Sequence, residues 1–292
     1  MSRKILILFG VLILSLIFSA HPMNSANSSE RKLKVFVSVP PQAYFVERIG
    51  GEFVEVYTLV QPGHSPATYE PTPRQMTQLS GADILFSIGV PYEDGLLPKV
   101  KSAIKSLKIV NMAEGIKLRK MEGHADHHGH EYDPHVWLDP LLVKKMANRI
   151  YSILIKSDTQ NAKHYKANIE QFLNDLDSLH QEIKTILLPL KNRDIYVFHP
   201  SYGYFADRYN LKQIAVEIEG KEPGAKQLAS LIERAKQMEV KTIFVQPQFS
   251  EKTAQSVAGA IGGEVVHLDP LAGDYISNLK DIALKIKENL NR

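Results

Sequence analysis

Residues 161–188 read NAKHYKANIEQFLNDLDSLHQEIKTILL, and this stretch continues unbroken to Pro189. Its apolar side chains recur at spacings of three and four residues, the period of an α-helix with one buried face. They are Tyr165, Ile169, Phe172, Leu176, Leu179, Ile183 and Ile186. About 26 helical residues would extend for roughly 39 Å, which is longer than a small domain is wide. Such a helix either lies in a bundle or ties two lobes together.

Strands and helices alternate on both sides of this stretch. Short apolar runs at residues 33–39, 81–89 and 108–112 have the composition of buried strands, with helical patterns at residues 41–51 and 72–81 between them. A similar alternation begins at residue 193, and such alternation predicts a parallel α/β lobe. The sequence therefore predicts an α/β protein of two parallel-sheet lobes, residues 33–158 and 193–292, joined by one long helix at residues 161–188.

The first 26 residues predict export from the cytoplasm. Two basic residues, Arg3 and Lys4, precede an apolar run of about fourteen residues that ends at Phe18. That run is short for a membrane span and typical of a signal peptide, with cleavage expected between Ala20 and Ala26. An uncleaved anchor is the alternative. Because the chain has no cysteine, it offers no residue for a lipid anchor, and a free periplasmic protein is expected.

Charge and cysteine content narrow the class of partner. Beyond the predicted signal peptide, 33 basic residues face 32 acidic ones. This balance favours neither nucleic acid nor an anionic membrane as the partner. The absence of cysteine excludes a disulfide framework, so stability must come from burial in lobes of ordinary size. A monomer is expected.

Four side chains follow predicted strands and are candidate metal ligands. They are His64 in GHSPATYEPTP, His135 in DPHVWLDP, His199 in VFHPSYGYF and Asp269 in HLDPLAG. Ligands collect beyond the carboxyl ends of parallel strands, and three imidazoles with one carboxylate suit tetrahedral Zn²⁺. The alternatives are structural roles: buried, hydrogen-bonded histidines at 135 and 199, and a turn cap at Asp269. Asp139 is expected to be the N-cap of the following helix.

Five motifs in this order, around one long helix, resemble the metal-binding solute receptors of zinc and manganese ABC transporters. They are YEPTP after a Gly-x-Ser-Pro turn, DPHVWLDP, FHPSYGYF, GKEPGAKQL and LDPLAG. The resemblance covers essentially the whole mature chain. It implies two α/β lobes joined by a rigid helix, one metal ion in the cleft, and delivery of that ion to a membrane permease. It also implies that His135, His199 and Asp269 are ligands.

The first ligand position departs from the family pattern. The resembled receptors usually read Pro-His-x-Tyr-Glu-Pro there, whereas this chain reads PATYEP, with Ala67 in place of the histidine. His64 precedes Ala67 by three residues, and in a turn or helix-like segment these positions project to the same side. His64 is therefore predicted to substitute as ligand. The alternative is a surface histidine and a three-ligand site that water completes.

A second group of histidines lies in residues 121–132. The segment GHADHHGHEYD contains His124, His127, His128 and His130, and its glycines and lack of apolar period are typical of an exposed loop. Such a loop binds Zn²⁺ weakly because ordering it costs entropy. We expect an accessory role in collecting metal or reporting zinc supply. Incidental affinity is the alternative.

Ligand chemistry and motif content separate the competing functions. Three imidazoles favour Zn²⁺ over Mn²⁺, which prefers a more oxygen-rich shell. A manganese receptor, or one for another divalent metal, is the alternative within the family. A zinc hydrolase would need a general base and an open position for water, yet the chain has no His-Glu-x-x-His or Gly-x-Ser-x-Gly motif. A zinc-storage protein or adhesin would show only weak, loop-dependent sites. The sequence favours a receptor that is not an enzyme.

Overall fold

Two parallel sheets form the frame of the protein. The computed structural model describes residues 31–121, 132–216, 225–249 and 251–290. In these ranges the strands of the first sheet are β1 (Leu33–Val37), β2 (Val54–Thr58), β3 (Ile84–Ser87) and β4 (Lys108–Asn111). The strands of the second are β5 (Asp194–Val197), β6 (Lys212–Ala215), β7 (Thr242–Val245) and β8 (Glu264–His267). The predicted α/β class with two parallel sheets is confirmed.

Helices connect and cover these strands. Those that precede the long helix are α1 (Pro40–Gly50), α2 (Pro73–Ser80), α3 (Tyr92–Ala103) and α4 (Pro140–Ser157), with short 3₁₀ turns η1 (Gly51–Phe53) and η2 (Val136–Leu138). The long helix is α5 (Ala162–Leu187). Those that follow it are α6 (Gly203–Tyr209), α7 (Ala225–Gln237), α8 (Glu251–Ile261) and α9 (Tyr275–Leu290). We call the part before α5 the first lobe and the part after it the second lobe.

Both sheets have the same strand order. Hydrogen-bonded neighbours follow the order β2-β1-β3-β4 in the first sheet and β6-β5-β7-β8 in the second, and all pairs are parallel. In open sheets of this kind, ligands bind beyond the carboxyl ends of the two strands at which the order reverses. In the second lobe these strands are β5 and β7. His199 lies two residues after β5, and Gln246 directly follows β7.

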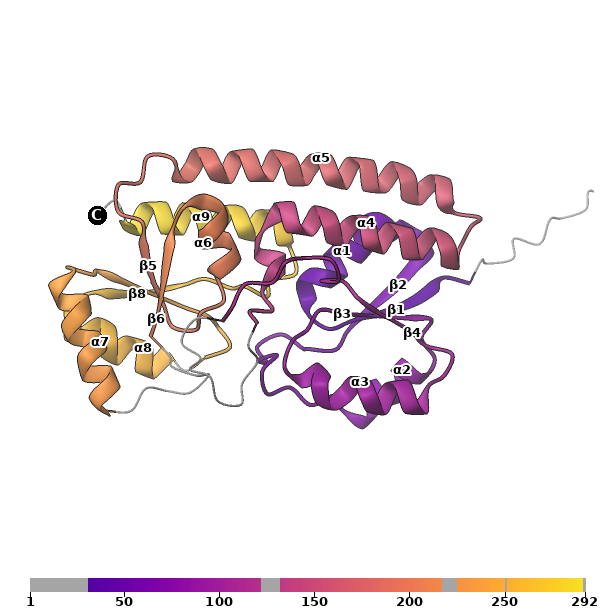
Figure 1. The fold of residues 1–292 in the computed structure, drawn as a ribbon, viewed down its shortest axis with the longest axis horizontal. Coiled ribbons are helices and arrows are strands. Elements are labelled where there is room, and N and C mark those ends of the chain that lie inside the picture. Colours follow the sequence, from indigo (N-terminus) through magenta and orange to yellow (C-terminus); the bar gives the residue numbers. More distant parts are fainter. Residues whose placement is uncertain (1–30, 122–131, 217–224, 250, 291–292) are drawn as a thin grey trace, which may run out of the picture. The chain divides into compact units, whose positions relative to one another are not determined.

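The helix α5 confirms the apolar period of residues 161–188. It spans 26 residues, and six of the seven predicted apolar positions are buried. At its end Leu187 is buried and Ile186 is only half-buried. These residues follow Ile183 by four and three positions, and both spacings return to the same side of a helix. The helix packs on α1 and α4 of the first lobe and on α6 and α9 of the second (Figure 1). Among the described helices, α5 included, none is long and apolar enough to cross a membrane.

An aromatic cluster beneath α5 belongs to both lobes. The ring of Phe172 on α5 lies 6.0 Å from that of Phe45 on α1, and Phe45 lies 4.8 Å from Tyr275 on α9. The Tyr275 hydroxyl donates to the carbonyl of Trp137 (2.7 Å), and the Trp137 indole donates to the carbonyl of Pro270 (2.8 Å). These four ring residues are buried in one hydrophobic cluster. The two lobes therefore share a core at this seam.

His180 on α5 is expected to make the stability of the fold sensitive to pH. Its Nδ1 lies 3.3 Å from the hydroxyl of Tyr209 on α6. Burial, with the nearby positive charge of Arg208, lowers the pKa of His180. The unfolded chain therefore binds this proton more readily than the folded protein does. The free energy of unfolding is expected to fall as pH drops below the ordinary histidine pKa of about 6.5.

Replacement of His180 with glutamine is expected to reduce this pH dependence. The measurement is the free energy of unfolding from urea denaturation between about pH 5 and about pH 7.5, the range in which histidine changes charge. His164→Gln is the matched control, because His164 is an exposed histidine on the same helix. An identical pH profile for wild type and His180→Gln would contradict the prediction.

Candidate metal centre

His135 is held by a buried carboxylate two residues earlier in the chain. The His135 backbone N–H donates to Asp133 Oδ1 (2.9 Å), and the ring Nδ1 lies 2.7 Å from the same oxygen. The Asp133 side chain is fully buried. A carboxylate at Nδ1 places the proton there and leaves the Nε2 lone pair available. Histidines that ligate metals are typically held in this way.

His199 of the second lobe lies beside His135 of the first. Its backbone N–H donates to Gln246 Oε1 (3.2 Å) and its carbonyl accepts from Gln246 Nε2 (2.6 Å). The His199 ring stacks on Phe249, with centroids 4.8 Å apart. The centroids of the two imidazoles are 5.4 Å apart, at an interplanar angle of 72°. The structure thus brings together two of the four predicted ligands, one from each lobe.

Asp269 follows β8 and caps a turn. Its Oδ1 accepts from the Leu271 backbone N–H and from Gln248 Nε2, both at 2.9 Å. Burial first, and then the Asp269 carboxylate, raise the pKa of Tyr202 well above its ordinary value. The turn-cap role named as the alternative is therefore present. It engages Oδ1, so metal binding through Oδ2 is compatible with it.

His64 lies in an exposed turn of the first lobe. Its Nδ1 is 3.3 Å from the carbonyl oxygen of Pro62, and its ring meets Tyr69 edge-on at 5.7 Å. No group of three or more histidine, aspartate or glutamate side chains close enough to hold a metal ion occurs among the described residues. The structure therefore leaves His64 and Asp269 apart from the histidine pair, and the four-ligand set remains a prediction.

The predicted accessory loop meets the described chain next to the candidate centre. His124, His127, His128 and His130 lie outside the described residues. On either side of them Lys120 and Tyr132 form an antiparallel bridge, and the backbone N–H of Asp133 donates to the carbonyl of Arg119 (2.9 Å). The described residues on either side of this segment are therefore paired, and Tyr132 directly precedes Asp133.

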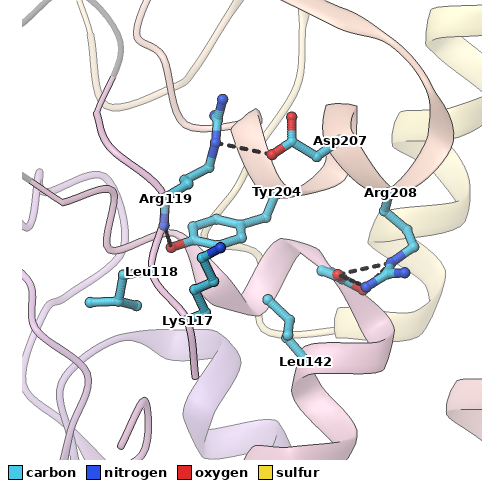
Figure 2. A pocket seen from close by; sticks show the side chains of 8 residues that line it. Lys117, Leu118, Arg119, Leu142, Tyr204, Asp207 and Arg208 are labelled. Atoms are coloured by element: carbon cyan, nitrogen blue, oxygen red, sulfur yellow. Dashed lines mark hydrogen bonds and ion pairs between the residues drawn. The ribbon is translucent and has the colours of Figure 1, made fainter. Parts of the chain in front are cut away.

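A polar cavity lies between the lobes, with Arg119 and Tyr204 in its lining (Figure 2). Its volume is about 400 Å³, and it is lined by Lys117, Leu118, Arg119, Asp139, Leu142, Tyr204, Asp207 and Arg208. The Tyr204 hydroxyl donates to the carbonyl of Asp133 (2.9 Å) and accepts from the Arg119 backbone N–H (3.0 Å). Burial raises the pKa of Tyr204 to about 12, so this hydroxyl stays protonated. Tyr204 of α6 thereby fixes the segment before His135.

One role predicted from sequence is confirmed beside this cavity. Asp139 is the N-cap of α4, and its Oδ1 accepts from the Leu141 backbone N–H (2.8 Å). The same carboxylate binds Arg208 of α6 through two guanidinium nitrogens, with Nη2 to Oδ2 at 2.6 Å. The sequence reasoning missed this bridge between the lobes, and it also missed the role of Asp133. An acidic residue two positions before a ligand histidine is the signal that would have indicated it.

Two parallel α/β lobes that share one helix, with a histidine from each lobe at their seam, define a solute-binding receptor of the metal-binding class. Residues 35–289 match the family model described as ZnuA, zinc-uptake complex component A, periplasmic. The protein belongs to this ZnuA family. Its members are substrate-binding receptors of ABC transporters.

Relatives and solved structures agree with this membership. The high-affinity zinc uptake system protein ZnuA of Bacillus subtilis is 30% identical over 263 residues, which cover 85% of this chain and 82% of the relative. The manganese ABC transporter substrate-binding lipoprotein PsaA of Streptococcus pneumoniae is 27% identical over 311 residues, covering 99% of this chain and 98% of that protein. A crystal structure of ZnuA is 43% identical and superposes with a TM-score of 0.84, over 88% of this chain and 99% of the other.

Proposed function

We propose that the protein is a high-affinity Zn²⁺ receptor that delivers the ion to an ABC-transporter permease for uptake. The observation that carries the proposal is the pair of imidazoles of His135 and His199, with ring centroids 5.4 Å apart. Imidazole suits Zn²⁺, whereas Mn²⁺ prefers oxygen ligands. The B. subtilis relative is named for high-affinity zinc uptake, and a ZnuA deletion variant of known structure, 43% identical to this chain, has zinc bound.

In this proposal the ion gathers its ligands from both lobes. His135 and His199 form the preassembled half of the site, and Asp269 supplies a carboxylate oxygen. His64 completes a tetrahedral shell by a movement of its exposed turn. Zn²⁺ favours four ligands of this kind, and the energy of coordination offsets the cost of ordering the turn. Manganese binding, as named for the S. pneumoniae relative, is the alternative within the family.

The setting of the proposed receptor is the periplasm. The predicted signal peptide and the family description support export, and the absence of cysteine supports a protein without a lipid anchor. We propose a monomer that meets its permease transiently and has no enzymatic activity. The histidines at 124, 127, 128 and 130 form weak accessory sites that collect the ion near the cleft.

A zinc titration of the chelator-stripped mature protein tests this function. Trp137 is the only tryptophan in the chain, and its ring lies 5.2 Å from that of His135, so its fluorescence reports on the candidate site. One tight site that excess Mn²⁺ does not displace is expected, with weak sites that disappear when residues 124–130 are deleted. Only weak, loop-dependent binding would favour zinc storage or adhesion. Displacement by Mn²⁺ would favour a manganese receptor.

His64→Ala is expected to weaken the tight site by about 10-fold, less than the loss of a preassembled ligand does. The reason is that ordering the turn of His64 costs conformational entropy, and this cost offsets part of the free energy that its coordination contributes. The measurement is a competition titration with a chelator of known zinc affinity. His267→Ala is the control, because His267 is also an exposed histidine and its Nε2 lies 3.5 Å from Glu251 Oε1. Unchanged affinity in His64→Ala would show a three-ligand site completed by water.

A further inference from the structure

The carboxylate that holds His135 is linked to the second lobe through one arginine. Arg119 Nη1 lies 3.4 Å from Asp133 Oδ2. Arg119 Nε lies 3.2 Å from Asp207 Oδ2 on α6, the pair that Figure 2 shows. The other oxygen of Asp133, Oδ1, lies 2.7 Å from His135 Nδ1. A single guanidinium therefore connects a helix of the second lobe to the imidazole of the first.

Gly203, the first residue of α6, leaves room for this guanidinium. A Cβ atom at position 203 would overlap the Arg119 guanidinium and would lie 2.8 Å from Asp133 Oδ2. The backbone of Gly203 does not have the positive φ at which glycine is favoured. Its missing side chain therefore serves the close approach of α6 to Arg119 and Asp133.

Burial distinguishes the two ion pairs of Arg119. The Asp133 side chain is 0% exposed, whereas that of Asp207 is 62% exposed. A fully buried carboxylate needs a cation, while a pair with an exposed carboxylate is weak. The bond to Asp133 is thus the one on which the site depends. Asp207 and the hydroxyl of Tyr204, which accepts from the Arg119 backbone N–H, set where the guanidinium lies.

We propose that Arg119 is the positioning residue through which the second lobe controls how firmly His135 holds Zn²⁺; this inference rests on the proposed receptor function. While α6 lies against the first lobe, Arg119 holds Asp133 where it fixes His135 Nδ1. When α6 moves away, Asp207 and the Tyr204 hydroxyl no longer set where the Arg119 guanidinium lies, and Asp133 loses the oriented cation beside it. The His135 ring is then free to turn, which accelerates release of the ion.

The test is the rate at which Zn²⁺ leaves the full mature protein in the presence of excess chelator. Arg119→Gln and Gly203→Ala are each expected to raise this rate by about 10-fold or more, the scale on which outer-shell partners act. Gly203→Ala keeps every charge but displaces the Arg119 guanidinium and crowds the Asp133 carboxylate. Arg119→Lys keeps the positive charge and should raise the dissociation rate less than Arg119→Gln does. The exposed Asp207→Asn should raise the rate more modestly.

Arg208→Gln is the matched control. It removes an arginine–aspartate pair between the same helix and the first lobe, but Arg208 binds Asp139, whereas the carboxylate beside the His135 ring is Asp133. A loss of lobe docking alone would affect Arg119→Gln and Arg208→Gln equally. The absorption spectrum of the Co²⁺-loaded protein is a second readout, because it reports on the ligand geometry. It is expected to change with Arg119→Gln and Gly203→Ala and to stay unchanged with Arg208→Gln.

The outcomes separate the two proposals. A wild-type dissociation rate and Co²⁺ spectrum in both Arg119→Gln and Gly203→Ala, with tight zinc binding in wild type, would overturn the role of Arg119 alone. Equal effects of Arg119→Gln and Arg208→Gln would also overturn it. If wild type binds no zinc tightly, the receptor function fails and this inference fails with it. If Arg119→Gln does not fold, Gly203→Ala and Asp207→Asn decide the matter.

Discussion

Replacement of His135 with alanine is expected to lower the affinity for Zn²⁺ by more than about 100-fold. Loss of an outer-shell partner typically costs 10- to 100-fold, and loss of the ligand that the partner serves costs more. His135 is the predicted ligand with the most complete support, because Asp133 fixes its ring and leaves Nε2 available. The variant also leaves the Asp133 carboxylate buried beside a smaller side chain. The measurement is a chelator competition titration that covers several decades of affinity.

His164→Ala is the control for this substitution. His164 is an exposed histidine on α5 whose ring lies 4.9 Å from that of Phe53, so its loss removes an imidazole without touching the histidine pair. Its affinity is expected to equal that of wild type. Tight zinc binding in His135→Ala, at the wild-type stoichiometry, would contradict a site centred on His135 and His199. Thermal unfolding of the zinc-free proteins shows whether the variant is folded.

The parts of the fold that were predictable from sequence are those with a long or simple apolar pattern. The apolar period of residues 161–188 extends over about seven helical turns, so the predicted helix has the same length as the observed helix α5. The strand β2 was missed because it is an edge strand in which only Val54 is buried. The helix α3 was missed because Gly95 and Pro98 lie inside it, and both residues usually argue against a helix.

The candidate site was predictable only where its chemistry shows in local sequence. His135 and His199 stand in short motifs after strands, and the structure places them side by side. Arg119 and Asp133 are 14 residues apart, and Gly203 meets them from the other lobe. No local pattern connects such positions, because the contact depends on how α6 packs against the first lobe. The roles of these three residues therefore required the fold.

The shared core explains why one helix can serve two lobes. Phe172 on α5 is fully buried and lies 6.0 Å from the rings of both Tyr44 and Phe45 on α1. The guanidinium of Arg48 lies 5.1 Å from the Phe172 ring, in the geometry of a cation–π contact. Tyr275 of the second lobe packs against the same cluster. A defect at position 172 therefore removes contacts that both lobes use.

Phe172→Ala is expected to lower the free energy of unfolding by about 3–5 kcal/mol, the usual cost of deleting a buried ring and leaving a cavity. Because Phe172 packs in a cluster that includes residues of both lobes, the whole protein should still unfold in one transition, shifted to lower denaturant concentration. The measurement is urea denaturation followed by Trp137 fluorescence, which reports on the seam, and by circular dichroism, which reports on all helices. The two curves are expected to coincide.

Leu188→Ala is the control at the end of the same helix. Leu188 is 70% exposed, so its truncation should change the free energy of unfolding by no more than about 0.5 kcal/mol. Two separate transitions in Phe172→Ala, of which only one is shifted, would show that the lobes have independent cores. The helix α5 would then act as a tether between them. A single shifted transition instead means that the lobes cannot part without breaking the core beneath α5, which restricts metal release to small displacements at the seam.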